Sequence, residues 1–258
     1  MKEGVKIKRI HFFNSRNQKL VGILNENETG RIVVICHGFT SSKNCNFIPP
    51  LADYLCDNGH SVLRFDFTGN GESEGELCEG TYSQENNDLK KVIDFVKKLN
   101  YKKISVIGHS MGGAVAILRA SEDERINCLI TISAVAYPGR ERLTGKQKDD
   151  LKKKGHVHYW GKYRIDKNFI DDASCYDLTK YISKVKVPVL IVHGDKDDVV
   201  VLKEGRDIYK NANNPKQLEV IKNAGHEFGY VGNYKKQKET SEYKIMKEKI
   251  LDFLRSNV

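Results

Sequence analysis

The feature that most constrains the fold is a series of short, wholly apolar runs separated by segments of helical periodicity. The clearest runs are RIVVIC at 31–36, ISVIG at 104–108 and VPVLIVHG at 187–194. A strand with one face in water alternates apolar and polar residues, whereas a run that is apolar throughout is typical of a central parallel strand covered by helices on both faces. The alternation of such strands with helices predicts an α/β fold with a doubly wound, mostly parallel sheet.

The same reading, extended along the chain, predicts eight strands and five helices in a single domain over residues 1–258. The strands are expected at 5–13, 19–25, 31–36, 61–66, 103–107, 127–133, 187–193 and 217–222, the first two as a hairpin. The helices are expected at 47–57, 84–99, 111–121, 203–210 and 239–254.

Residues 137–185 break this rhythm and are rich in Lys, Asp and aromatic side chains, which predicts a small cap inserted between two strands. Within the insertion, HVHYWGKYRI at 156–165 alternates on both sides of Trp160 and Gly161. This pattern predicts a β-hairpin with the glycine in its tight turn.

The segment ISVIGHSMGGAVAIL at 104–118 places G-x-S-x-G between a buried strand and a helix of small residues. This is the context of a nucleophile elbow, a turn so tight that Gly must stand at 108 and 112. Ser110 would then sit at a helix N-terminus, where the helix dipole favours developing negative charge. We therefore expect Ser110 to be a nucleophile.

A serine hydroxyl needs a base, and the base needs a carboxylate that holds its tautomer. Asp195, Asp197 and Asp198 follow the strand at 187–193, and His226 follows the next strand. The order Ser, acid, His is the one expected for this kind of fold, with any of the three aspartates as the acid.

An oxyanion hole in such a fold uses the N–H of the residue after the nucleophile and another from the loop after an earlier strand. These positions are Met111 and Phe39. Phe39 follows His37-Gly38, where the glycine allows the chain to turn sharply.

With these motifs the chain resembles the α/β-hydrolase family, in particular cinnamoyl (feruloyl) esterases, monoglyceride lipases and the serine aminopeptidase branch. The motifs that carry the resemblance are HGFTSSK at 37–43, RFDFTGNGESEG at 64–75, GHSMGG at 108–113, HGDKDDVV at 193–200 and NAGHEF at 223–228. The resemblance implies that Asp197 is the acid of the triad, with Asp195 and Asp198 as alternatives. One departure is Asn70, where the family often has His, in a loop that serves as scaffold.

The short insertion resembles the cap of the cinnamoyl esterases, which implies that it covers the substrate pocket. Tyr159, Trp160, Tyr163 and Phe169 are therefore candidate pocket residues. The alternative for each is that it holds the cap to the body of the protein.

We expect a serine carboxylesterase acting on small or aromatic acyl esters, with thioesterase, monoacylglycerol lipase and peptidase as alternatives. A ligand-binding relative without catalysis is the alternative of another class. No cofactor is expected, since Gly69–Gly75 lacks the dinucleotide-binding spacing. No metal is expected either, because the fold itself accounts for the strand-end histidines His37, His109, His193 and His226. The pair His156 and His158 has no evident third ligand.

Composition adds four expectations. The net charge of +9 comes from dispersed lysines, which argues against a nucleic-acid partner. No apolar run is long enough to span a membrane. Six scattered cysteines and a first segment without a secretion signal predict a cytoplasmic protein with free thiols. The oligomeric state is left open.

Overall fold

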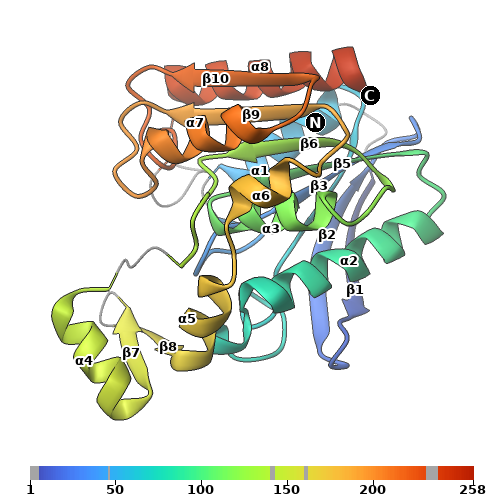
Figure 1. Ribbon diagram of the computed structural model, residues 1–258. Helices are drawn as coiled ribbons and strands as arrows, with labels where there is room; N and C mark the ends of the chain where they lie inside the picture. Colours follow the sequence, from blue (N-terminus) through green and yellow to red (C-terminus); the bar gives the residue numbers. More distant parts are fainter. Residues whose placement is uncertain (1–5, 46, 140–142, 160–161, 231–237) are drawn as a thin grey trace.

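The computed structural model describes residues 6–45, 47–139, 143–159, 162–230 and 238–258, and its centre is an eight-stranded sheet (Figure 1). The first two strands form an antiparallel hairpin, the second is antiparallel to β4, and all other neighbours are parallel. This confirms the predicted mostly parallel α/β sheet. The strands across it are β1 (Lys6–Phe13), β2 (Lys19–Glu26), β4 (Ser61–Phe65), β3 (Arg31–Cys36), β5 (Lys103–His109), β6 (Ile126–Ile132), β9 (Val189–Gly194) and β10 (Lys216–Ile221).

Helices cover both faces of this sheet, which explains the wholly apolar strands. In β9, Val189 and Ile191 join one hydrophobic cluster while Leu190 and Val192 join the other. One face carries α2 (Tyr82–Lys98), α3 (Met111–Ala120), α6 (Leu178–Ile182) and α7 (Leu202–Asn211), and the other carries α1 (Ile48–Asp57) and α8 (Ser241–Asn257). Both sides of each central strand are therefore buried.

The five predicted helices are all present, and capping side chains set the start of two of them. The α2 helix begins two residues before the predicted start because the Thr81 hydroxyl accepts a hydrogen bond from the Gln84 N–H at 3.2 Å. The α8 helix begins two residues later than predicted because Thr240 caps it in the same way.

The insertion between β6 and β9 contains α4 (Gly145–Lys154), the paired strands β7 (His156–Tyr159) and β8 (Tyr163–Asp166), and α5 (Lys167–Ser174). The two strands form the expected hairpin, and its turn residues Trp160 and Gly161 lie outside the described residues. These elements project from the body, whereas the following helix, α6, packs against α3 and α7 (Figure 1). We use "cap" for the projecting elements α4, β7, β8 and α5.

Buried polar contacts fasten both ends of the insertion to the body. Where the chain leaves β6, the Glu204 carboxylate on α7 accepts a hydrogen bond from the Ala136 N–H at 2.8 Å. Near the end of the cap, Asp172 on α5 accepts hydrogen bonds from both the backbone N–H and the hydroxyl of Ser83 at the start of α2. The cap is thus attached to helices of the sheet's flank.

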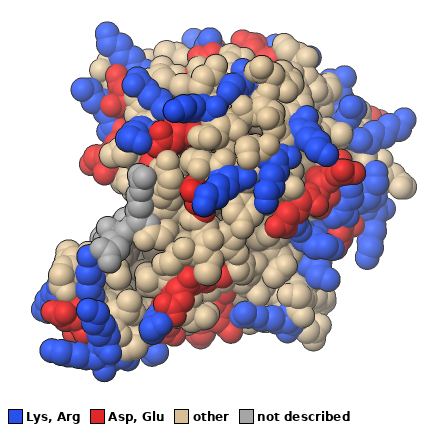
Figure 2. All heavy atoms as spheres, in the orientation of Figure 1, with Lys and Arg blue, Asp and Glu red and all other residues tan. Residues whose placement is uncertain are grey.

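On the face of the molecule shown in Figure 2, Lys and Arg side chains are dispersed among Asp and Glu rather than forming one continuous patch. Across the described part of the chain, no helix combines the length and the apolar character that a membrane span requires.

Candidate active site

Ser110 occupies a strained turn between β5 and α3. Its φ is 54° and its ψ is −120°, a conformation that costs a non-glycine residue about 1–3 kcal/mol. The turn is held by the neighbouring strand, because the Ser110 N–H donates to the Ile132 carbonyl at 2.9 Å. A Cβ atom at Gly108 would lie 2.2 Å from the Gly112 carbonyl oxygen, and one at Gly112 would lie 2.3 Å from that of His37. Both glycines are therefore required by the close approach of backbone.

The sheet places the His37–Phe39 loop beside this turn. Strand β3 pairs with β5, with Cys36 opposite Gly108, at the point where the strand order reverses. Ligands of open α/β sheets bind at such a switch point, beyond the carboxyl ends of the strands. The approach is so close that a Cβ atom at Gly38 would lie 3.1 Å from the Ser110 Cβ.

His37 fixes the course of this loop from a fully buried position. Its Nδ1–H donates to the Gly38 carbonyl at 2.8 Å, and its Nε2 accepts from the Phe67 N–H at 3.1 Å. Phe39 and Met111 both line the cavity above Ser110. The N–H of Met111 is the first of α3, so it has no acceptor within the helix and is available to an anion.

His226 and Asp197 meet at the ends of β10 and β9, which are adjacent and parallel. The His226 Nδ1–H donates to Asp197 Oδ2 at 2.9 Å, which leaves Nε2 unprotonated as a base. Asp197 Oδ1 accepts from the N–H groups of Val199 and Val200 at 3.0 and 2.8 Å. Burial alone would raise the pKa of Asp197, but the hydrogen bond and charge of His226 outweigh it and hold that pKa below its ordinary value.

The structure distinguishes among the three aspartates of this loop. Asp195 and Asp198 are exposed, and Asp195 Oδ1 accepts from the Asn223 N–H at 2.6 Å, as a turn residue does. Asp197 is buried and alone among the three is hydrogen-bonded to His226 in the described structure.

Two further histidines support this pair, and motif reading did not assign them a role. The ring of His109 lies 4.7 Å from the ring of His226, and its Nε2–H donates to the His226 carbonyl at 3.1 Å. Behind the acid, His193 donates from Nε2 to the Val200 carbonyl at 2.8 Å, with Asp197 Oδ2 at 3.5 Å. Burial lowers the pKa of both histidines, that of His109 to about 3. Both are therefore neutral and serve as hydrogen-bond donors that position the loops of His226 and Asp197.

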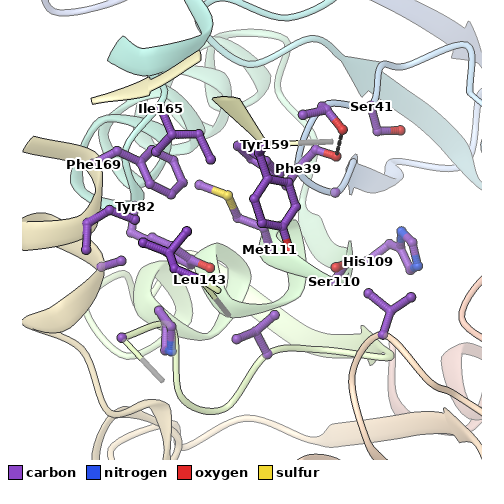
Figure 3. A pocket seen from close by; sticks show the side chains of 18 of the residues that line it. Phe39, Ser41, Tyr82, His109, Ser110, Met111, Leu143, Tyr159, Ile165 and Phe169 are labelled. Atoms are coloured by element: carbon purple, nitrogen blue, oxygen red, sulfur yellow. Dashed lines mark hydrogen bonds between the residues drawn. The ribbon is translucent and has the colours of Figure 1, made fainter. Parts of the chain in front are cut away.

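Ser110 and His226 open into one cavity of about 590 Å³ beneath the cap, within the range of small-molecule sites (Figure 3). Apolar side chains dominate the part of the cavity that adjoins the cap. Thr40 and Ser41 also line the cavity and provide hydroxyl groups. The residues of the apolar part include Tyr82, Met111, Leu143, Tyr159, Ile165 and Phe169.

Of the four aromatic residues predicted for the pocket, Tyr159 and Phe169 line the cavity. Both also contact Phe39, with ring centroids 6.0 and 5.4 Å apart, so they hold the cap to the body as well. Tyr163 does not line it, although it lies opposite Tyr159 in the hairpin, and the Lys162 ammonium lies 5.0 Å from its ring centroid. Trp160 lies outside the described residues.

Several lining residues carried no signal in the sequence. Tyr82 comes from the start of α2, and Lys148, Leu151 and Lys152 come from α4, whose helical character was not predicted. Their spacing of three and four residues would have identified a common face once the helix was known. Within the ranges that the structure describes, no group of three His, Cys, Asp or Glu side chains is arranged to hold a metal ion.

Comparison with known proteins identifies the family of the chain. The family model described as "Serine aminopeptidase, S33" matches residues 27–174 and 173–229. A 31.7 kDa Escherichia coli protein encoded in the traX-finO intergenic region is 24% identical, covering 79% of this chain and 85% of that protein. The mitochondrial palmitoyl-protein thioesterase ABHD10 of Bos taurus is 28% identical over 65% of this chain and 57% of its own length.

Solved structures resemble the chain over nearly its full length. Est1E from Butyrivibrio proteoclasticus, in its complex with ferulic acid, superposes with a TM-score of 0.84 at 24% identity, covering 96% of this chain and 98% of that chain. The Pyrococcus furiosus esterase Pf2001 superposes with a TM-score of 0.74 at 26% identity, covering 98% and 92%. The fold is therefore that of the α/β-hydrolases.

Proposed function

The chain belongs to the serine aminopeptidase S33 family and is a hydrolase of the α/β-hydrolase fold, and from that premise we propose that it is a serine carboxylesterase. Ser110 would be the nucleophile, His226 the base and Asp197 the acid that orients it. The observation that carries the proposal is the 2.9 Å hydrogen bond between His226 Nδ1 and Asp197 Oδ2. His226 lines the same cavity as Ser110, which lies in a strained turn. These are the parts that acyl transfer requires.

In the first half of the reaction, His226 Nε2 takes the proton of the Ser110 hydroxyl as Oγ bonds to the ester carbonyl carbon. The resulting oxyanion is stabilised by the backbone N–H groups of Met111 and Phe39. As the carbon–oxygen bond to the leaving alcohol breaks, the protonated histidine gives its proton to that oxygen, and the acyl group stays on Ser110.

In the second half, water takes the place of serine. His226 removes a proton from the water as it attacks the acyl carbon, and the same histidine returns a proton to Ser110 Oγ when that bond breaks. The carboxylic acid leaves and the free serine is restored. Asp197 remains ionised throughout and stabilises the imidazolium, which its lowered pKa favours.

A small or aromatic acyl ester is the preferred substrate because the cavity has a volume of about 590 Å³ and is lined mainly by aromatic and aliphatic side chains. The likeness to the Pyrococcus furiosus esterase supports an ester. A thioester is the second candidate, favoured by the likeness to the palmitoyl-protein thioesterase ABHD10.

The test is labelling with a fluorophosphonate probe, followed by turnover of p-nitrophenyl esters, cinnamoyl esters and acyl-CoA thioesters. Wild-type protein should be labelled, and Ser110→Ala should lose both labelling and turnover, by about 10⁴-fold or more. Ser256→Ala, on the exposed side of α8, is the matched control and should behave as wild type. A folded wild-type protein that reacts with none of these substrates would instead support the non-catalytic binding protein.

A further inference from the structure

Lys43 is only 1% exposed, although its side chain carries a charge. It lies in the loop that follows β3, and we use "oxyanion loop" for residues 37–43. The Lys43 ammonium donates to the carboxylate of Asp66, which is fully buried, and to that of Glu72. A lysine is almost never fully buried without such a partner. The ion pair with Asp66 therefore fixes the place where the oxyanion loop ends.

The two ends of the oxyanion loop are held by consecutive residues, Asp66 and Phe67, directly after β4. At the start of the loop, His37 Nε2 accepts from the Phe67 N–H at 3.1 Å. At its end, the Lys43 N–H donates to Asp66 Oδ1 at 2.6 Å, and the Lys43 ammonium donates to Asp66 Oδ2. Strands β3 and β4 are adjacent and parallel, so these attachments lie at the same edge of the sheet.

Between the two attachments lies Phe39, whose N–H is assigned to the oxyanion hole. The next residue, Thr40, has a φ of 55°, in the left-handed region that β-branched residues rarely adopt. Such a conformation persists only where the surrounding contacts determine it. Phe39 and Thr40 line the cavity and Lys43 does not, so Lys43 acts on a substrate only through the course of the oxyanion loop.

Stability alone does not account for a charged pair at this place. Apolar side chains of similar size usually stabilise a protein as well as a buried ion pair does, because the pair loses the hydration of both charges. The contacts of Lys43 are directional instead. Its N–H donates to Asp66, and its carbonyl accepts from Arg64 Nη1 at 2.9 Å. The orientation of the backbone is therefore fixed on both sides of this residue.

We propose that the buried ion pair of Lys43 with Asp66 positions the backbone N–H of Phe39 for the oxyanion, which makes Lys43 a positioning residue of the reaction. The inference rests on the proposed esterase function and adds a residue to its machinery. An oxyanion hole is effective because its donors are in place before charge develops. Loss of the ammonium should therefore weaken stabilisation of the transition state and leave substrate binding nearly unchanged.

The test removes the ammonium in two ways. Lys43→Met keeps the length of the side chain but leaves the Asp66 carboxylate unpaired, which can prevent folding. The double variant Lys43→Met/Asp66→Asn avoids this, because it leaves no buried charge in the pair. Arg125→Met is the control, since Arg125 also bridges two carboxylates, those of Asp94 at 2.7 Å and Asp123 at 2.6 Å, and does not line the cavity. Circular dichroism and urea denaturation check that each variant is folded.

Two ketones separate positioning from a general loss of structure. When trifluoromethyl phenethyl ketone binds, Ser110 Oγ bonds to its carbonyl carbon, the serine proton passes to His226 and the carbonyl oxygen becomes an oxyanion. Methyl phenethyl ketone has nearly the same shape, but its carbonyl carbon is much less electrophilic and it binds mainly as the intact ketone. Only the first ligand therefore depends on the oxyanion hole.

The kinetics use the p-nitrophenyl ester that wild type hydrolyses best. The folded Lys43 variants should lose about 10- to 100-fold in kcat while KM stays within about twofold. The inhibition constant of the trifluoromethyl ketone should rise by a similar factor, and that of the methyl ketone should stay within about twofold. Arg125→Met should match wild type in all four quantities.

Two failures are distinguishable. If folded wild-type protein hydrolyses none of the esters, the proposed function fails. If wild type is active and a folded Lys43 variant keeps its kcat, or loses affinity for both ketones equally, the esterase stands and this inference is wrong.

Discussion

The catalytic region and the cap are stabilised by different interactions. We use "floor" for the turn and loops around Ser110, His37, Asp197 and His226 on the body of the protein. On the floor, Ser110, Asp197 and His37 are each fixed by hydrogen bonds to backbone groups of neighbouring strands and loops. In the cap, no residue of α4 is fully buried, although Leu151 packs against the core from a partly buried position. The cap contacts Phe39 through Tyr159 on β7 and Phe169 on α5. The difference indicates that the chemistry depends on a rigid floor, whereas the cap is free to vary with the substrate.

The largest effect should come from the acid on the floor. Asp197→Asn keeps the shape of the side chain but no longer favours the tautomer of His226 that leaves Nε2 unprotonated, so kcat should fall by about 10⁴-fold. Asp198→Asn, one residue away and exposed, is the control and should change kcat by less than about twofold. Steady-state kinetics on one p-nitrophenyl ester measures both. Equal activity of the two variants would contradict the assignment of Asp197.

A smaller effect is expected when a methyl group is added to a glycine of the floor or of the cap and the free energy of unfolding is compared. Gly112→Ala would place its Cβ 2.3 Å from the His37 carbonyl oxygen, so the free energy of unfolding should fall by about 2–3 kcal/mol. Gly145→Ala at the start of α4 meets nothing within 4 Å and should leave that free energy unchanged or raise it by up to about 0.5 kcal/mol. Urea denaturation measures the difference, and similar values for the two variants would show that the floor is not the tightly packed region.

This contrast also explains how much the sequence could predict. The residues of the floor were predicted from local sequence patterns. Ser110 has a glycine two residues before and after it, and Asp197 and His226 each follow the end of a strand. The sheet and five of the six helices described on its faces were predicted, because apolar periodicity records burial on each face, whereas the short α6 was not. The starts of α2 and α8 differ from the predictions by two residues, where a threonine cap decides them, and α8 continues three residues beyond its predicted end.

The cap was predicted only in part for the same physical reason. Since no side chain of α4 is fully buried, its sequence has no apolar period that could identify a helix. Strand pairing places Tyr159 and Tyr163 opposite each other in the hairpin, and only the tertiary placement of the hairpin decides that Tyr159 lines the cavity and Tyr163 does not. That residues of α4 line the cavity depends on how the helix is placed in the tertiary structure, which its sequence does not record.

The smallest effect is expected in the pH dependence of stability, which we compare between His109 on the floor and His158 in the cap. Burial, followed by the nearby charge of His226, lowers the pKa of His109 to about 3, whereas an unfolded histidine titrates near 6.5. Between these values the unfolded state binds one more proton, so the stability contributed by neutral His109 is complete above about pH 6.5 and is lost as the pH falls. His158, exposed on β7, lacks this burial.

His109→Gln keeps a donor for the His226 carbonyl but removes the titrating group. Between pH 7 and pH 5 its free energy of unfolding should fall by about 2 kcal/mol less than that of wild type, while His158→Gln should follow the wild-type protein. Urea denaturation at the two pH values measures this difference. Because His37, His60 and His193 also have lowered pKa values, both proteins should still lose stability in acid. An identical loss in wild type and His109→Gln would mean that His109 is hydrated in solution, and the floor would then be less closed than its packing indicates.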